Sequence, residues 1–520
     1  MKKTAYFCME FAIDQALKTY AGGLGFLAGS HFRAAKRLNQ PLVGVSILWS
    51  YGYYDQVRDV NGDMEVKYIR KYYEFLEDLN FKFSIKINNR DVWVKVYKLE
   101  EDVFNTCPIY FLTTDIPEND DFGREISYRL YDANNLLHVA QEILLGKGGY
   151  IAIKELEKDV ELFHMNEPHS LPLVFKMLSE HNLSYVKEHV VFTTHTPLPE
   201  GNEVQDLNFL NSMNFFEDVS LEVAKKLGGE PFNYTACALR VSKKANAVSK
   251  RHREVCEEMW RGLKDRCEIM AITNAQDRHY WQDSIIKEAA EKYDIDLLRE
   301  RKLELKEILF EEVADQTGKI FKKNRLTVVW ARRFVPYKRP YILLYDERKL
   351  RELIKKKKIQ VIWAGKPHPA DSKMIATFNY IVSKTRSLKG AAILTGYELK
   401  LSKMLKQGSD IWLNTPKLKH EASGTSGMTA SMNASIHMST LDGWHVEWAK
   451  MYPDDSFTIG DGVRDDDEYV ANCIYSLLSD VSDLYDTEAW WIKACNCVNH
   501  IVEYFDAERM AKEYAEKLYK

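Results

Sequence analysis

The feature that most constrains the fold is a repeated pairing of apolar, β-branched runs with longer helical segments. The runs end in Gly, Thr or Asn before helix-like sequence follows, and they are AYFCMEFAI, PLVGVSILWS, HVVFTTHT, RLTVVWAR, KIQVIWAG, AAILTG and SDIWLN. Nearly continuous apolar runs of this kind are typical of parallel strands that helices cover on both faces. The pattern therefore predicts an α/β protein with doubly wound, Rossmann-like sheets.

The domain boundaries follow from length and from one charged helical run. A chain of 520 residues is too long for a single compact core. The run LLRERKLELKEILFEEVADQTGKIFKKN gives way to the strand RLTVVWA, so we expect domains at 1–318 and 319–485, with C-terminal helices over 486–520. A β-hairpin insertion is expected near 81–99, where FKFSIKI alternates apolar and polar residues before an Asn-Asn turn.

Composition and cysteine spacing exclude several classes of function. With 28% charged residues and a net charge of −4, the chain lacks the basic excess that a nucleic-acid partner requires. The eight cysteines form no C-x-x-C pair, so no metal site is expected. No leader sequence and no run of about 20 apolar residues is present, which predicts no membrane span and a cytoplasmic location.

Polar residues after the strand-like runs form the candidate site, because open parallel sheets bind ligands at the carboxyl ends of their strands. The stretch AGGLGFLAG contains Gly23 and Gly25, whose backbone N–H groups can approach a phosphate; a tight turn without a ligand is the alternative. The stretch WARRFVPYKRP places Arg333 and Lys338 near two further arginines, a set that suits phosphate or diphosphate. A charged rim paired with acidic neighbours is the alternative there.

A third stretch, EASGTSGMTASMN, joins a glycine-bearing turn to a helix. Backbone amides and the helix dipole of this turn favour an anion, and the residues are Gly424, Thr425, Ser426, Gly427, Met428 and Thr429. Glu421 would repel an anion, so we expect it to accept hydrogen bonds from sugar hydroxyls. His195 ends the strand-like run HVVFTTHT and faces the same region in this interpretation, although a lone histidine is more often structural. Phosphate donors beside a hydroxyl acceptor describe a sugar phosphate site.

At these residues the sequence resembles the α-glucan phosphorylases (glycogen, starch and maltodextrin), particularly their short bacterial and archaeal form. The matching segments run through most of the chain in order and include FCMEFAI, YAGGLGFLAG, HMNEPH, FTTHTPLPEG, VVWARRFVPYKRP and SDIWLNTPKLKHEASGTSGM. The resemblance implies a GT-B fold, in which two Rossmann-like domains face each other across a cleft and the last helices return to the first domain. It also implies retaining transfer of a glucosyl unit between a glucan end and phosphate.

The resemblance assigns roles to the residues already singled out. Arg333 and Lys338 would bind phosphate, Glu421 and Asn274 would contact the sugar, and the backbone carbonyl of His195 would lie beside it. The glycines at 23 and 25 would approach the phosphate. The expected catalytic residues are thus Arg333, Lys338, Glu421 and His195.

One departure from the family changes the expected chemistry. Thr429 stands where the family carries the lysine that forms a Schiff base with pyridoxal phosphate, and no lysine follows from Ala430 to Thr440. No cofactor is therefore expected. Thr429 also lies eight residues after Glu421, the spacing at which many retaining nucleotide-sugar transferases carry a glutamate that binds ribose. A nucleotide diphosphate could occupy the volume that the absent cofactor leaves, with the threonine hydroxyl bonding a ribose or phosphate.

Three functions are compatible with the sequence. The first is a retaining hexosyltransferase that uses a nucleotide-activated sugar; the second is an α-glucan phosphorylase that binds its cofactor or another anion without the imine. The third is a non-catalytic sugar-binding or regulatory protein. Ala275 replaces a glycine usual in the family within ITNAQDRHYW, which indicates a changed sugar specificity. The partners expected are a sugar donor and a carbohydrate or other hydroxyl acceptor, with a homodimer left open.

Overall fold

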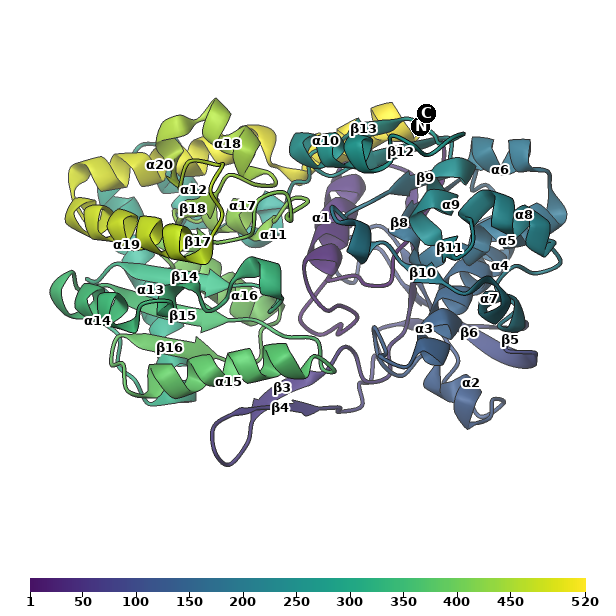
Figure 1. Cartoon of the computed structure of the whole chain (residues 1–520), viewed down its shortest axis with the longest axis horizontal. Helices are drawn as coiled ribbons and strands as arrows, with labels where there is room; N and C mark the ends of the chain where they lie inside the picture. The colour runs from purple at the N-terminus through teal and green to yellow at the C-terminus, as the bar shows by residue number, and fades with distance from the viewer. The chain divides into compact units, whose positions relative to one another are not determined.

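The computed structural model describes all residues from 1 to 520 and divides the chain into two compact units. Unit 1 comprises Met1–Tyr54, Tyr68–Asn274 and Ala507–Lys520, and unit 2 comprises Asp55–Lys67 and Ala275–Asp506. Each unit is built around its own mainly parallel sheet with helices packed on it (Figure 1). The predicted α/β class with two Rossmann-like sheets is thus confirmed.

Unit 1 contains a nine-stranded sheet in the order β13-β12-β9-β8-β1-β2-β7-β6-β5. Its strands are β1 (Thr4–Phe7), β2 (Leu42–Ile47), β5 (Glu77–Ile87), β6 (Arg90–Leu99), β7 (Ile109–Thr113), β8 (Leu162–Asn166), β9 (Val190–Thr193), β12 (Lys244–Ala247) and β13 (Ile269–Ala271). All pairs from β13 to β7 are parallel. Every residue of β1, β2, β7, β8 and β9 is buried, as expected for a sheet that is covered on both faces.

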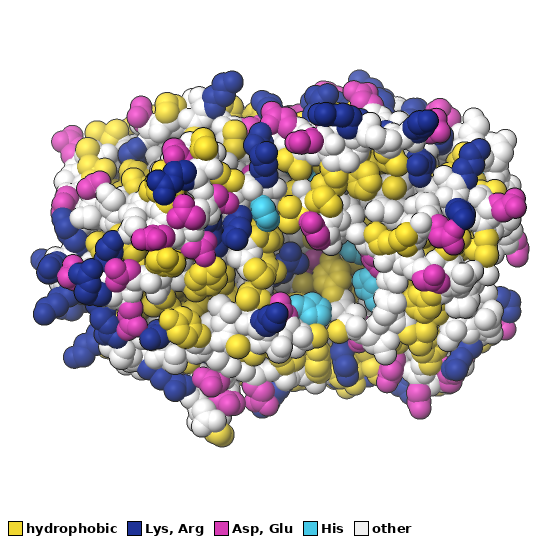
Figure 2. Space-filling model, viewed as in Figure 1, with side chains coloured by type: hydrophobic (Ala, Val, Ile, Leu, Met, Phe, Trp, Pro, Cys, Tyr) yellow, Lys and Arg dark blue, Asp and Glu magenta, His cyan; other side chains and the backbone are white.

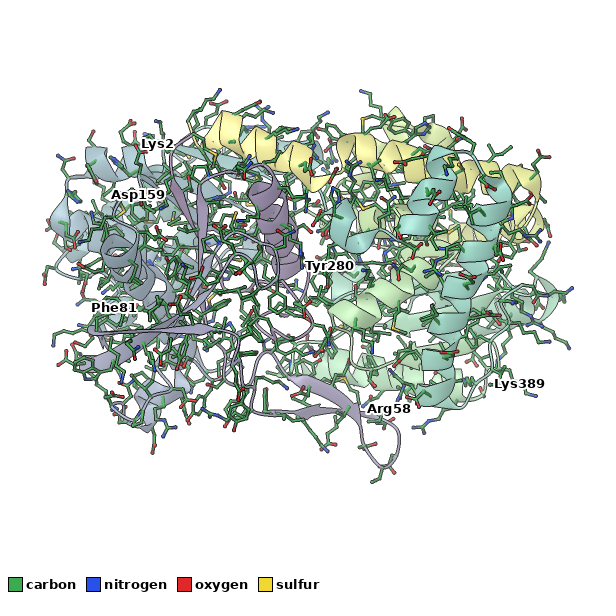
Figure 3. The ribbon with its side chains drawn as sticks, turned by 180° about the vertical axis from the view of Figure 1, so that it is seen from behind. Lys2, Arg58, Phe81, Asp159, Tyr280 and Lys389 are labelled. Carbon is green, nitrogen blue, oxygen red and sulfur yellow. The ribbon has the colours of Figure 1, made fainter.

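The antiparallel hairpin of β5 and β6 forms one edge of this sheet. Asn88 and Asn89 make its turn with φ angles of 52° and 57°. A two-residue turn with positive φ at both positions favours asparagine, which tolerates this conformation better than most residues. Figure 3 marks Phe81 on this hairpin.

Unit 2 contains a six-stranded parallel sheet in the order β16-β15-β14-β17-β18-β19. Its strands are β14 (Thr327–Ala331), β15 (Gln360–Ala364), β16 (Ala391–Leu394), β17 (Ile411–Asn414), β18 (Ile436–Thr440) and β19 (Ser456–Ile459). Counted along the chain, this is the order 3-2-1-4-5-6 of dinucleotide-binding folds. The strand order reverses between β14 and β17, so the loops after these strands diverge and leave room for a ligand.

The division between the units lies earlier than the boundary expected at 318/319. Helix α13 (Ile295–Thr317) precedes the second sheet in sequence but packs on it, because Leu309 and Val313 share a hydrophobic core with Val329 and Ile362. On the same helix, Lys306 forms a buried ion pair with Asp410, 2.5 Å from Nζ to Oδ2. The main segment of unit 2 begins at Ala275, ahead of this helix.

The C-terminal helices also differ from the expectation that 486–520 joins the first domain. Helices α19 (Asp467–Leu484) and α20 (Glu488–Tyr504) belong to unit 2, and only Ala507–Lys520, with α21 (Ala507–Glu513), belongs to unit 1. In this segment, Glu508 accepts a hydrogen bond at 3.0 Å from Nε of Arg37, the last residue of α1 (Gly23–Arg37) in the same unit.

A short hairpin of β3 (Asp55–Arg58) and β4 (Met64–Lys67) extends from the N-terminal part of the chain but belongs to unit 2. The amide of Gln56 donates to the carbonyl of Gly365 at 3.0 Å, and the backbone N–H of Met64 donates to the side chain of Asn379 at 2.9 Å. Figure 3 marks Arg58 on this hairpin, and its guanidinium donates to the carbonyl of Ile393 at 2.5 Å.

Charged side chains of both signs are present on the surface, and the helices fall short of the requirements of a membrane span. Lysine and arginine side chains alternate with aspartate and glutamate over the face shown in Figure 2. None of the helices combines the length and the apolar character that a membrane span requires.

Candidate functional site

The candidate site of unit 2 lies at the reversal of strand order, where open α/β sheets bind ligands. The segment after β14 supplies Arg332, Arg333 and Lys338, and the segment after β17 supplies Glu421. These two segments are separated by about 80 residues of sequence but leave adjacent strands. Residues that follow these strands in sequence therefore lie at one edge of the sheet.

Glu421 is the acceptor at the centre of this cluster. Arg332 forms an ion pair with its Oε2, and Lys338 Nζ lies 3.8 Å from the same oxygen. Burial alone would raise the pKa of Glu421, but the Arg332 and Lys338 cations hold it below its usual value. The carboxylate is thus ionised and able to accept hydrogen bonds from hydroxyl groups.

Lys338 is an amine whose charge depends on its surroundings near neutral pH. Burial lowers the pKa of Lys338 to about 7; Glu421 opposes this shift, whereas Arg332 and Arg333 add to it. An anion bound beside this amine would favour its charged form.

The four cations expected after β14 do not form a single site. Arg333 is exposed, whereas Arg332 is buried and paired with Glu421, with its second terminal nitrogen, Nη1, lacking a hydrogen-bond partner. Arg339 is fully buried and donates to the carbonyls of Thr415 and Pro416 and to Asp465. The backbone of Arg339 adopts a left-handed conformation, with φ of 51°. Its side chain stabilises the fold through these hydrogen bonds, and it does not belong to the candidate site.

The loop before α17 (Ser426–Ser431) is shaped around Glu421. Gly424 has φ of 82°, and a Cβ atom there would lie 3.1 Å from Glu421 Cγ and 3.3 Å from Arg332 Nη2. Asp442 Oδ2 accepts hydrogen bonds from the backbone N–H groups of His420 and Glu421, at 2.9 and 2.7 Å. Burial raises the pKa of Asp442 to about 6. These contacts fix the position of the Glu421 backbone.

The expected donor-binding stretch 424–429 is only partly accessible. Gly424, Thr425 and Ser426 are half-buried, but Gly427, Met428 and Thr429 lie in the interior. A Cβ at Gly427 would lie 2.4 Å from the His437 ring, so this glycine is needed for packing. The Thr429 hydroxyl donates to the carbonyl of Ser426 at 2.9 Å. Within this stretch only the first three residues are partly exposed, and donor binding by the whole stretch stays a prediction.

In unit 1, His195 lies at the carboxyl end of β9, beside Asn166, the last residue of β8, and Glu167, which follows it. Its Nε2 is 2.8 Å from Asn166 Oδ1, and its backbone N–H donates to Glu167 Oε1 at 2.6 Å. Burial lowers the pKa of His195 to about 3, so the imidazole is neutral at physiological pH. The ring is held by its neighbours, while the carbonyl is the group predicted to face the sugar.

Glu167 was missed by the sequence reasoning, although it stands in the quoted motif HMNEPH. It adopts a φ of 67°, a strained conformation for a glutamate, which costs about 1–3 kcal/mol and is concentrated at functional sites. Burial raises the pKa of Glu167 to about 7. Its neighbours Thr196 and His195 donate hydrogen bonds to the same oxygen.

The glycine stretch after β1 is organised by a carboxylate. Glu10 Oε2 accepts the backbone N–H groups of Ala21 and Gly22, at 2.7 and 3.0 Å, and a Cβ at Gly25 would lie 2.8 Å from this oxygen. A glycine is thus required at position 25 because any larger residue would collide with Glu10. From the sequence we expected a different reason, close contact with a phosphate. At Gly23, the first residue of α1, an added Cβ would meet nothing within 4 Å.

Asn274 is the last residue of unit 1 and follows β13. It is buried, and its side-chain oxygen has no hydrogen-bond partner. An unpaired buried amide oxygen is suited to a ligand hydroxyl, since leaving it unsatisfied is costly.

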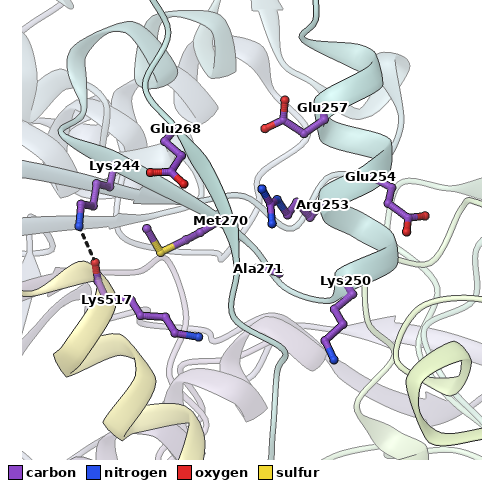
Figure 4. Close-up of a pocket in the computed structure, with 9 residues that line it drawn as sticks. All are labelled: Lys244, Lys250, Arg253, Glu254, Glu257, Glu268, Met270, Ala271 and Lys517. Carbon is purple, nitrogen blue, oxygen red and sulfur yellow. Dashed lines mark hydrogen bonds between the residues drawn. The ribbon is translucent and has the colours of Figure 1, made fainter. Parts of the chain in front are cut away.

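A surface cavity of about 840 Å³ lies elsewhere in unit 1, as Figure 4 shows. Its lining residues are Lys244, Lys250, Arg253, Glu254, Glu257, Glu268, Met270, Ala271 and Lys517. Basic and acidic side chains alternate, and Lys244 Nζ donates to the carbonyl of Lys517 at 3.0 Å. None of the predicted site residues lines this cavity, which therefore remains separate from the candidate site.

Comparison with known proteins gives consistent matches across the chain. Residues 240–477 match the family model described as carbohydrate phosphorylase. A glycogen phosphorylase of Aquifex aeolicus is 31% identical over 100% of this chain and 86% of its own length. A maltodextrin phosphorylase of Thermococcus litoralis is 29% identical over 99% of this chain and 70% of its own length. An uncharacterized protein of Methanocaldococcus jannaschii is 80% identical over the full length of both chains.

Proposed function

Because the chain belongs to the carbohydrate phosphorylase family of GT-B glycosyltransferases, we propose that it is a retaining hexosyltransferase that uses a nucleotide-activated sugar without pyridoxal phosphate. The observation that carries the proposal is the Arg332–Glu421–Lys338 cluster beside the exposed Arg333. It combines cations for a diphosphate with an ionised acceptor for sugar hydroxyls at the reversal of strand order. A decayed, non-catalytic relative would have no reason to keep this set buried and oriented.

In the proposed reaction, the bond between C1 of the sugar and the diphosphate oxygen breaks. Arg333 and Lys338 stabilise the negative charge that develops on the leaving diphosphate, a form of electrostatic help that often dominates such chemistry. The acceptor hydroxyl forms the new bond on the same face of the ring, and its proton passes to the leaving phosphate oxygen. In unit 2, Glu421 binds sugar hydroxyls and the half-buried residues Gly424–Ser426 contact the donor phosphates. In unit 1, Asn274 and the carbonyl of His195 remain the predicted contacts of a sugar, and Gly23 the predicted contact of a phosphate.

The residues present do not fit a covalently bound pyridoxal phosphate, which requires a lysine amine. In our proposal Thr429 takes the place of that lysine, and its hydroxyl is already engaged with Ser426. Two buried lysines of neighbouring helices are also engaged. Lys302 Nζ donates to the carbonyls of Gln407 and Asn433, and Lys406 lies 3.6 Å from the centre of the Trp281 ring. The proposed transfer therefore involves no imine.

The names of the relatives favour a second function, phosphorolysis of an α-glucan without the imine. It uses the same Arg333, Lys338 and Glu421, with inorganic phosphate in place of the diphosphate. The two functions differ in which anion binds tightly.

A thermal-shift screen of the purified protein separates the two functions. A nucleoside diphosphate at about 100 times its Kd is expected to raise the melting temperature of unit 2 by about 5 °C or more, because it binds only the native state. The screen should compare UDP, ADP, GDP and TDP with phosphate and pyridoxal phosphate, followed by an absorbance scan. Stabilisation by phosphate with pyridoxal phosphate, and by none of the nucleotides, would establish the phosphorylase instead.

The affinity for a nucleoside diphosphate is expected to fall about tenfold between pH 6 and pH 8 through Lys338. The amine is charged at pH 6, but above its pKa of about 7 binding must also return a proton to it, so the apparent affinity decreases. Isothermal titration at both pH values measures this. The diphosphate loses its own last proton near pH 6, so the control is Lys338→Met, which should bind weakly and lack this decrease. An equal decrease in both proteins would exclude Lys338 as its source.

A further inference from the structure

Unit 1 contains a compact cluster of one histidine and two glutamates apart from the residues used above. His138 and Glu142 lie one turn apart on α3 (Asn135–Ile143), and Glu203 lies just before β10 (Val204–Gln205). His138 Nε2 is 3.6 Å from Glu142 Oε1 and 3.2 Å from Glu203 Oε2. One ligand atom from each of the three residues lies within 4.8 Å of the other two.

Glu142 is the unusual member of this cluster. Its side chain is completely buried, and neither carboxylate oxygen makes a hydrogen bond of good geometry; the Tyr234 hydroxyl and the Glu203 carboxylate are polar groups close to it. A buried carboxylate without partners is strongly unfavourable, so it must be neutralised by a proton or by a cation. Two facing carboxylates and an imidazole leave the position between them as the place for positive charge.

We propose that His138, Glu142 and Glu203 bind a divalent transition-metal ion of the Zn²⁺ type. Imidazole nitrogen and carboxylate oxygens bind Zn²⁺ at about 2.0–2.2 Å, which places tetrahedral ligand atoms about 3.3 Å apart. The separations of 3.2 Å from His138 Nε2 to Glu203 Oε2 and 3.6 Å to Glu142 Oε1 match this spacing. From the sequence we expected no metal site, because the cysteines lack a metal-binding spacing. That reasoning does not apply to a site made of one histidine and two glutamates.

The surroundings of the cluster support a metal site with an entry path. The side chains of His138 and Glu203 are 22% and 21% exposed, so an ion can reach Glu142 from that side. Gln205 donates to the other Glu203 oxygen at 3.1 Å, which orients this ligand.

The test uses the full-length protein after removal of metal by a chelator. Titration with Co²⁺ should give one equivalent of visible absorption per chain that Zn²⁺ displaces, together with a higher melting temperature. Glu142→Gln is expected to weaken Co²⁺ binding by at least about 100-fold, since it removes a charged ligand. Glu188→Gln is the matched control, because this side chain is 62% exposed and outside the cluster. It should bind Co²⁺ like the unchanged protein.

Two results would overturn the proposal. The first is Co²⁺ binding that is absent, or equal in the unchanged protein and in Glu142→Gln. The second is a Glu142→Gln protein that is more stable than the metal-free original while added metal shifts neither melting temperature, since Glu142 would then be held by a proton. If Glu142→Gln does not fold, His138→Ala replaces it under the same criteria. None of these outcomes depends on the donor specificity of unit 2.

Discussion

Replacing Arg333 by alanine is expected to lower the rate of hexosyl transfer by about 100- to 1,000-fold while leaving the fold intact. Removal of one donor aimed at a developing negative charge has an effect of this size. Arg333 is exposed, so its truncation leaves no buried cavity and should change the free energy of unfolding by less than about 0.5 kcal/mol. Steady-state kinetics with the activated sugar found in the thermal screen measures the loss.

Arg348→Ala is the matched control for this substitution. Arg348 is 72% exposed on α14 (Glu347–Lys356), where it pairs with Glu352, and its removal should leave the rate unchanged. Undiminished transfer by Arg333→Ala would remove Arg333 from the proposed anion site. A fall in both proteins would instead indicate that general surface charge supports the activity.

Replacing Lys306 by methionine is expected to destabilise unit 2 by about 3–5 kcal/mol. Both members of the Lys306–Asp410 pair are at most 1% exposed, so the substitution leaves a buried carboxylate without its counter-charge. The change also removes hydrogen bonds to the carbonyl of Arg325 and to the hydroxyl of Tyr485, each 2.7 Å long. Urea denaturation followed by tryptophan fluorescence reports mainly on unit 2, because of the eleven tryptophans only Trp49, Trp93 and Trp260 lie in unit 1.

Lys302→Met provides the comparison on the same helix, one turn away. Lys302 is equally buried but donates to two carbonyls and to no carboxylate, so its loss should cost less, about 1–3 kcal/mol. Equal losses for the two substitutions would mean that burial of the lysine stem, and not the ion pair, stabilises unit 2.

The sequence predicted the fold class because buried parallel strands have a local signature, a short apolar run that needs no knowledge of its neighbours. It did not predict which sheet α13 joins. The spacing of Leu305, Leu309 and Val313 indicates an apolar face, but the residues that cover this face follow later in the chain. The predicted boundary at 318/319 was therefore placed just before the first strand of the second sheet, and α13, which packs on that sheet, was assigned to the wrong domain.

The candidate site was predictable to the extent that its residues follow strands. Arg332, Lys338 and Glu421 satisfy that rule, and the fold brings them together. The left-handed backbone conformation of Glu167 could not be predicted, because glutamate is not a residue type that favours this conformation. The cluster of His138, Glu142 and Glu203 joins two separate segments, of which only the histidine–glutamate spacing on one helix is visible in the sequence.

The last residues of the chain complete the core of the unit that begins it. Tyr519 lies 2.7 Å from the ring of His164 on β8, and the hydroxyl of Tyr514 accepts from Asn246 on β12 at 3.1 Å. During synthesis, the strands of unit 1 are made before unit 2, yet they cannot bury these positions until Ala507–Lys520 has left the ribosome. Folding of unit 1 is thereby tied to completion of unit 2, and a chain interrupted anywhere in unit 2 carries an incomplete core in unit 1.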